Sequence, residues 1–143
     1  MKKIVLIFVL LFGVLVADTE FADPPPSLEN PRKFVFPITK NTNEAINHVL
    51  NSANNVMKFY GPEKCEVCIV AYSKGITALR KNRLFAKRVR SLMTYDVEFI
   101  ACHNTMRTFS LKKKDLIDGV EVVTAGIVEL IERQLKGWIY IRP

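Results

Sequence analysis

Short apolar segments that alternate with helical patterns constrain the fold of this chain more than any other feature. Five segments have the length and the apolar or β-branched character of strands: 34–38, 65–72, 97–102, 120–124 and 138–141. The stretches between them carry apolar residues at helical spacing. Because strand–helix–strand connections are right-handed, this order predicts an α/β fold, with helices on both faces of a twisted, mostly parallel sheet.

The first strand and the helix after it carry distinct local signals. Pro37 cannot donate a ladder hydrogen bond, so this strand is expected to lie at an edge of the sheet or to lose its pairing at Pro37. Asn41 and Glu44 have the spacing of a capping box, and apolar residues recur at helical intervals as far as Tyr60. These signals predict a helix over about 41–60.

Two further segments have an apolar face. In 76–95, the apolar residues are Phe85, Val89 and Leu92, and the basic residues Arg80, Arg83, Lys87 and Arg90 fall on the opposite side. In 125–136, the residues expected to face inward are Ile127, Leu130, Ile131 and Leu135. Gly137 is in the position of a helix C-cap. The sequence therefore predicts helices in both segments, and shorter ones within 105–116.

The chain opens with the pattern of an export signal. Lys2 and Lys3 precede thirteen uncharged residues, and Ala17 offers a cleavage site. Because a bilayer span takes about 20 residues, we expect a signal peptide over 1–17, with a retained membrane anchor as the alternative. Residues 18–32 contain four prolines, which predict a linker before a single domain over 33–143. We expect a periplasmic or secreted protein without stable membrane insertion after cleavage.

The charge balance points to anionic partners only in general terms. Removal of 1–17 takes Lys2 and Lys3 with it and lowers the formal net charge from +7 to +5. The basic residues of 80–90 lack the interleaved aromatic side chains on which nucleic-acid bases stack. A solvated helix face is the favoured interpretation, and no nucleic-acid partner is expected.

Cys102 has the chemical setting that is clearest from the sequence. It ends the third predicted strand, and reactive groups in open α/β sheets collect at the carboxyl ends of strands. Asn104 is a natural N-cap for a helix that follows. Amide donors, the helix dipole and Arg107 would then lower the pKa of the Cys102 thiol. The alternative is that Cys102 is a small buried residue that ends a core strand.

The other two cysteines form a Cys-x-x-Cys motif that enters a strand. Because side chains alternate along a strand, Cys65 and Cys68 are expected on opposite faces, which suits packing better than a disulfide or joint metal binding. His48 and His103 add no second pair at zinc-ligand spacing. The sequence predicts no metal site and no cofactor. An odd number of cysteines leaves at least one thiol unpaired.

Three stretches resemble the DsrE/DsrF-like proteins: 97–105 (VEFIACHNT), 115–120 (DLIDGV) and 137–143 (GWIYIRP). The likeness covers about 33–143 and implies a three-layer α/β/α sandwich that forms homo-oligomers, commonly trimers or hexamers. In the sulfur-relay members a cysteine after a central strand accepts a persulfide, and Cys102 matches its position. Many relatives have a His-Gly pair where this chain has 72–75, which leaves Gly75 to supply the turn. Those members also work in the cytoplasm, whereas this chain carries an export signal.

Two functions follow from these observations. The first is sulfur handling, in which Cys102 takes a sulfane sulfur as a persulfide and yields it to an acceptor, with a donor or acceptor protein as partner. The second is a non-catalytic oligomeric module that holds a small ligand beside a structural Cys102. The residues predicted to line the site are Tyr72, Ser73, Gly75, Asn104, Thr105 and Arg107.

Overall fold

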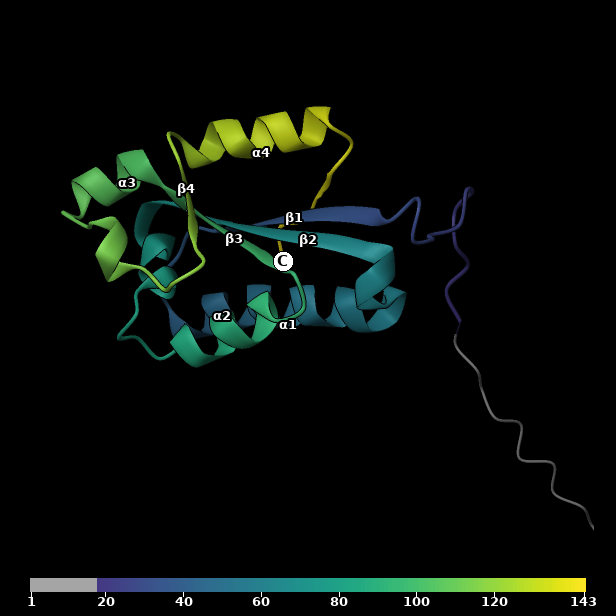
Figure 1. Ribbon diagram of the computed structural model, residues 1–143, viewed down its shortest axis with the longest axis horizontal. Coiled ribbons are helices and arrows are strands. Elements are labelled where there is room, and N and C mark those ends of the chain that lie inside the picture. The colour runs from purple at the N-terminus through teal and green to yellow at the C-terminus, as the bar shows by residue number, and fades with distance from the viewer. Residues whose placement is uncertain (1–17) are drawn as a thin grey trace, which may run out of the picture.

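The computed structural model describes residues 18–143, and the predicted signal peptide over 1–17 lies outside this range. Five strands form one sheet in the order β4-β3-β2-β1-β5, and every neighbouring pair is parallel (Figure 1). The strands are β1 (Arg32–Ile38), β2 (Cys65–Ala71), β3 (Glu98–Cys102), β4 (Glu121–Val123) and β5 (Ile139–Tyr140). The predicted α/β class and the mostly parallel five-stranded sheet are confirmed.

Helices cover both faces of this sheet and complete three layers (Figure 1). The α-helices are α1 (Asn43–Tyr60), α2 (Ala86–Met93), α3 (His103–Thr108) and α4 (Gly126–Leu135). The 3-10 helices are η1 (Pro62–Lys64), η2 (Ser73–Leu79) and η3 (Lys113–Asp115). α1 and α2 lie on one face, and α4 lies on the other. α3 follows the carboxyl end of β3, and its buried Met106 joins the cluster on the side of α1 and α2. Because the sheet is parallel, the carboxyl ends of all five strands meet at one edge.

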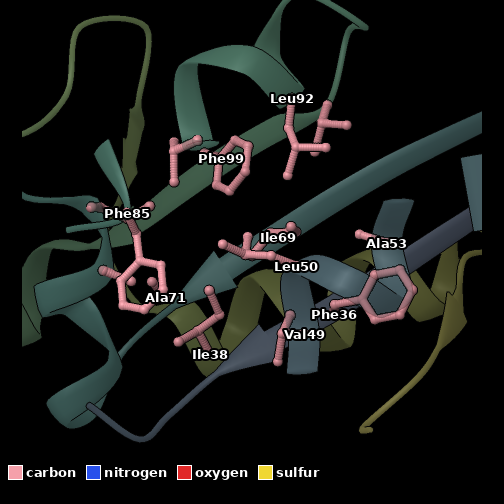
Figure 2. Packing of buried hydrophobic residues seen from close by; sticks show 14 of the residues in the cluster. Phe36, Ile38, Val49, Leu50, Ala53, Ile69, Ala71, Phe85, Leu92 and Phe99 are labelled. Atoms are coloured by element: carbon pink, nitrogen blue, oxygen red, sulfur yellow. The ribbon is translucent and has the colours of Figure 1, made fainter. Parts of the chain in front are cut away.

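The sheet separates two apolar clusters. Phe36, Ile69 and Phe99 point toward α1 and α2, where they pack with Leu50 and Leu92 (Figure 2). The smaller cluster on the other face consists of Val35, Cys68, Val70, Ile100 and Leu130. Residues one position apart in a strand therefore belong to different clusters, as the period of two requires.

The predicted helical region 76–95 is two pieces in the structure. η2 ends at Leu79, and α2 begins at Ala86. Between them, the Lys81 N–H donates to the Asp115 carbonyl at 3.0 Å, and the Ile117 N–H donates to the Leu79 carbonyl at 2.8 Å. These bonds pair residues 79–81 with 115–117 and end the helical path. The apolar side of α2 is buried and its basic side is exposed, as predicted.

The first strand and helix differ slightly from their predictions. The N-cap of α1 is Thr42 and not Asn41, and the Thr42 hydroxyl accepts from the Ala45 N–H at 3.3 Å. β1 lies inside the sheet, but its pairing with β5 covers only Phe34 and Val35. Pro37 thus lies beyond the end of β5, where its missing N–H breaks no pairing. Of the two expectations for Pro37, the loss of pairing is the correct one.

The inward face predicted for α4 is wrong for three of its four residues. Leu130 is buried, but Ile127, Ile131 and Leu135 are 51%, 48% and 76% exposed. The reason is that α4 rests on the sheet along a narrow line that contains Leu130 and the ion-paired Arg133. Apolar spacing predicts that a helix face is covered, but it does not say whether the sheet or another molecule covers it.

Residues 18–31 contain no helix or strand, but they are held against the domain. The ring of Phe21 lies 5.6 Å from that of Phe59 and 5.7 Å from that of Tyr60, measured between centroids. The Arg32 guanidinium donates to two carbonyls of this segment. Between residues 18 and 143, no helix is long and apolar enough to cross a membrane.

Candidate functional site

Cys102 lies at the carboxyl edge of the sheet, where two helices begin. It is the last residue of β3 and also the N-cap of α3. On its other side is Gly126, the first residue of α4. The Cys102 residue is 5% exposed. The first-turn amides of both helices, which have no partner within their own helix, therefore surround the thiol.

These surroundings favour the thiolate. Burial acts to raise the pKa of Cys102, but hydrogen bonds from the Thr105 hydroxyl and from the amides of Gly126, Thr105 and Asn104 outweigh it. The net result is a pKa below the ordinary value of a cysteine. Hydrogen bonds to a charged acceptor are stronger than those to a neutral one, so the four donors stabilise the anion selectively. The prediction of a lowered pKa agrees with the geometry.

A contact with Ser73 orients the Thr105 hydroxyl as a hydrogen-bond donor to the Cys102 thiol. The Ser73 N–H donates to the Thr105 Oγ1 at 3.1 Å, which occupies a lone pair of the hydroxyl and leaves its proton for the thiol. Ser73 follows β2 and has a φ of 52°, in the left-handed region that is unfavourable for serine. The segment after β2 is thus bent in a way that aims one amide at Thr105.

Gly126 permits α4 to approach Cys102 closely. A Cβ on Gly126 would lie 3.2 Å from the Cβ atoms of both Cys102 and Tyr72, and 3.3 Å from Cγ1 of Val70. The two Cβ atoms are bonded directly to backbone, so they cannot move away as the end of a long side chain could. From the sequence, Gly126 is only one of the residues of the helix predicted over 125–136. The signal that could have found it is a glycine at the first helical turn directly after a strand.

Arg133 fixes the other end of α4. Its guanidinium forms ion pairs with Glu98 of β3 and, at 2.7 Å, with Glu129 one turn earlier. The same group lies 4.3 Å from the centroid of the Trp138 ring. Its side chain is 13% exposed, so this cluster is shielded from solvent more than a surface ion pair. Arg133 therefore holds α4 against the sheet and keeps Gly126 beside the thiol.

The other two cysteines have surroundings that disfavour the thiolate and raise the pKa. Cys65 and Cys68 lie in different apolar clusters on the two faces of the sheet, as predicted, and all three cysteines are free. Burial raises the pKa of Cys65, and Glu63 adds to this effect. Burial raises the pKa of Cys68 strongly, with Arg133 opposing it only in part. Of the three thiols, only Cys102 has surroundings that favour the anion.

The structure brings together some of the predicted site residues but not others. Tyr72 borders Gly126, and burial raises the pKa of its phenol, with a further rise from Tyr140 and a partial offset from Arg142. Asn104 is not the N-cap, a position that Cys102 itself occupies, and its amide helps to lower the pKa of Cys102 while it also donates to the Thr124 carbonyl at 3.2 Å. Arg107 is exposed at the end of α3, and no hydrogen bond or ion pair joins it to Cys102 in the described part of the chain.

Gly75 closes the turn after β2, as its N–H donates to the Tyr72 carbonyl at 3.1 Å, but the need for glycine at this position has another cause. It does not adopt the left-handed conformation, but a Cβ there would lie 2.1 Å from the Ile38 carbonyl oxygen. Close packing of η2 on the end of β1, and not turn geometry, requires glycine at this position. Within residues 18–143, no three His, Cys, Asp or Glu side chains are grouped so that they could hold a metal ion.

The comparison with protein families decides what kind of domain this is. The model of the DsrE/DsrF-like family matches residues 32–143, which include the sheet and the Cys102 site. The chain belongs to the DsrE/DsrF-like family. The resemblance inferred from three short stretches is thus confirmed, and it extends over all elements from β1 to β5.

Two solved structures resemble this DsrE/DsrF-like domain. MTH1491 from Methanobacterium thermoautotrophicum, described as a protein of unknown function, is 32% identical, with a TM-score of 0.75 over 78% of this chain and 99% of that chain. YchN from E. coli is 18% identical, with a TM-score of 0.69 and the same coverage, and it shares the fold. No curated protein sequence matches the chain significantly.

Proposed function

We propose that the chain is a sulfur carrier, in which Cys102 accepts a sulfane sulfur as a persulfide and passes it on. One observation supports this proposal above the others: Cys102 is the only one of the three thiols with a lowered pKa, and its four hydrogen-bond donors suit an anionic sulfur. The thiolate is the nucleophilic form of cysteine. The family relationship supports sulfur chemistry at the position of Cys102.

The transfer needs no group beyond two thiols and a persulfide. The Cys102 thiolate attacks the outer sulfur of a donor R–S–SH, a new S–S bond forms, and the old one breaks with its electron pair leaving on R–S⁻. Cys102 then carries –S–SH. In the second step an acceptor thiolate attacks that outer sulfur, and Cys102 leaves as the thiolate that the amides stabilise. Sulfur moves twice with no net oxidation, so the site requires no acid–base residue.

Intact-protein mass spectrometry tests this proposal directly. After incubation with inorganic polysulfide, the full chain should gain the mass of one sulfur, and peptide mapping should place it on Cys102. The Cys102→Ala variant should show no such gain. Cys65→Ala is the matched control, because it removes a thiol whose pKa is raised, and it should load like the parent protein. An equal mass gain in Cys102→Ala would contradict the carrier role.

Export is the second part of the proposal. The pattern of residues 1–17 supports transport out of the cytoplasm, to the periplasm or beyond. The low exposure of Cys102 suits such a location, because a shielded thiol meets oxidants less often than an exposed one. Protein isolated from its native compartment should begin at Asp18. A chain that begins at Met1 and fractionates with membranes would contradict cleavage and favour a retained anchor.

Self-association is the third part. The exposed stripe of α4 consists of Ile127, Val128, Ile131 and Leu135, and the neighbouring Ile139 of the edge strand β5 is 50% exposed. Exposed apolar patches of this kind are typical of protein–protein interfaces. Every copy carries the same stripe, so two copies can cover each other around a two-fold axis, which a hexamer contains. We therefore expect α4 to form a contact between copies.

Light scattering after size-exclusion chromatography measures this association. The parent protein should have the mass of a hexamer, since a trimer contains no two-fold axis. Ile131→Asp should reduce that mass to the trimer, because it places a charge within the stripe that forms the two-fold contact. Leu84→Asp is the matched control, since Leu84 is 72% exposed and lies outside α4. A monomeric parent protein, or loss of association in both variants, would contradict an interface on α4.

A further inference from the structure

A cavity of about 450 Å³ opens at the carboxyl end of β1, apart from the four donors around Cys102. It exists because β5 stops pairing with β1 at Val35, while β1 continues to Ile38 with Pro37 facing the vacant position. The polar residues that line it are Thr39, Lys40, Thr42, Glu44, His48 and Arg142. Its volume is typical of a small-molecule site.

Side chains of both charges line this cavity, and they form no ion pairs with other residues of the described chain. Lys40, Arg142 and Glu44 take part in none of the ion pairs found within residues 18–143, and all three are exposed. Two cations and one carboxylate suit a ligand that has carboxylates and an ammonium group. A simple anion would meet the Glu44 carboxylate as a repulsive group. The lining therefore favours an amino acid or a small peptide over an inorganic anion.

The register of the sheet gives the distance between the cavity and the thiol. Ile38 pairs with Ala71, and Ala71 pairs with Ala101, so the next residues lie at the same level: Thr39 directly after β1, Tyr72 directly after β2 and Cys102 at the end of β3. Neighbouring strands lie about 4.8 Å apart, which places Thr39 about 10 Å from Cys102. An extended tripeptide spans about 10 Å.

Tyr72 lies between the cavity and the Cys102 thiol. It directly follows β2, the strand between β1 and β3, and it borders Gly126 beside the thiol. Arg142, which lines the cavity, partly offsets the rise in the pKa of the Tyr72 phenol. A ligand that extends from the cavity to Cys102 would therefore cross Tyr72 and stay in contact with the carboxyl edge along its length.

We propose that this cavity binds the amino-acid end of a small acidic peptide persulfide, whose outer sulfur reaches Cys102. The inference rests on the proposed carrier function and specifies the sulfur donor. Lys40 and Arg142 would hold the carboxylate of that end, and Glu44 would hold its ammonium group. The Cys102 thiolate attacks the outer sulfur, the donor's S–S bond breaks, and the peptide leaves as its thiolate, which the cavity then releases.

Two sulfur donors, one with a peptide and one without, test this inference. Glutathione persulfide carries two carboxylates and an ammonium group, whereas inorganic polysulfide carries none of them. The rate of Cys102 persulfidation is measured by mass spectrometry on the full chain. In the Lys40→Ala/Arg142→Ala variant the rate with glutathione persulfide should fall about tenfold, as loss of contacts worth about 1.4 kcal/mol requires, and the rate with polysulfide about twofold at most. Lys87→Ala/Arg90→Ala removes the same charge from the exposed side of α2 and is the control.

Glu44→Gln separates peptide binding from general attraction of anions. Loss of the ammonium contact should slow transfer from glutathione persulfide about threefold. If the basic side chains only attracted anions, removal of the Glu44 charge would speed up transfer from both donors, and that result would overturn the inference. Equal slowing with both donors in Lys40→Ala/Arg142→Ala would also overturn it while leaving the carrier function intact. Failure of both donors to load the parent protein would instead refute the carrier function itself.

Discussion

Replacement of Thr105 by valine tests the physical origin of the reactive thiol. Valine keeps the shape of threonine but removes the hydroxyl that donates to Cys102 and accepts from the Ser73 N–H. A hydrogen bond to a charged group is worth about 1.5–3 kcal/mol, so its loss should reduce the thiolate fraction below the pKa about tenfold to a hundredfold. A thiolate of higher pKa is also more nucleophilic, with a Brønsted coefficient of about 0.5. The alkylation rate should therefore fall about threefold to tenfold.

The assay is the pH profile of Cys102 alkylation by iodoacetamide, followed by mass spectrometry. In Thr105→Val the midpoint of the profile should move to higher pH, because the variant loses a donor that stabilises the anion. Thr105→Ser is the matched control, since it keeps the hydroxyl and should keep the midpoint. The reasoning would be refuted if valine and serine gave the same profile as the parent protein, because the pKa would then not depend on this donor.

Three further predictions concern α4 and the thiol. Gly126→Ala should slow Cys102 alkylation at neutral pH severalfold, because a Cβ 3.2 Å from two fixed Cβ atoms pushes the amide away; an unchanged pH profile would contradict this. Leu130→Ala should lower the free energy of unfolding by about 2–5 kcal/mol in urea titrations, whereas Ile131→Ala, on the half-exposed side, should cost less than half as much; equal losses would contradict the orientation of α4. The free energy of unfolding of the parent protein, relative to that of Cys102→Ala, should rise with pH between the lowered pKa of Cys102 in the folded state and its unfolded value of about 8.5. The reason is that in this range the unfolded state still binds the proton that the native state has lost. A difference that does not change with pH would contradict a lowered pKa.

The fold could be predicted because its signals are local. Short apolar segments and helical spacing identify strands and helices one at a time, and the handedness of the connections leaves few ways to assemble them. The break between Leu79 and Ala86 could not be predicted in this way. It depends on hydrogen bonds to residues 115–117, more than thirty positions further along the chain, and the local periodicity contains no information about them.

The candidate site could be predicted only in part for a similar reason. The end of a strand is a local feature, and it led to Cys102 and to the amides that follow it. The Gly126 amide comes from a helix beyond the next strand, and the Ser73 amide precedes Thr105 by 32 residues. The cavity beside Lys40 arises because β5 is short, which is a property of pairing and not of composition. Each missed feature joins segments that are distant in the sequence.

The two roles of α4 make self-association and reactivity depend on each other. One end of this helix places the Gly126 amide beside Cys102, and its outer side carries the apolar stripe around Ile131. Contacts with the sheet come from a narrow line through Leu130 and Arg133, so a second copy that covers the stripe would restrain the helix further. A state that binds a partner more tightly is the state that the partner stabilises. Ile131→Asp should therefore slow Cys102 alkylation, although residue 131 lies more than one helical turn from Gly126 and on the side of α4 that faces away from the sheet.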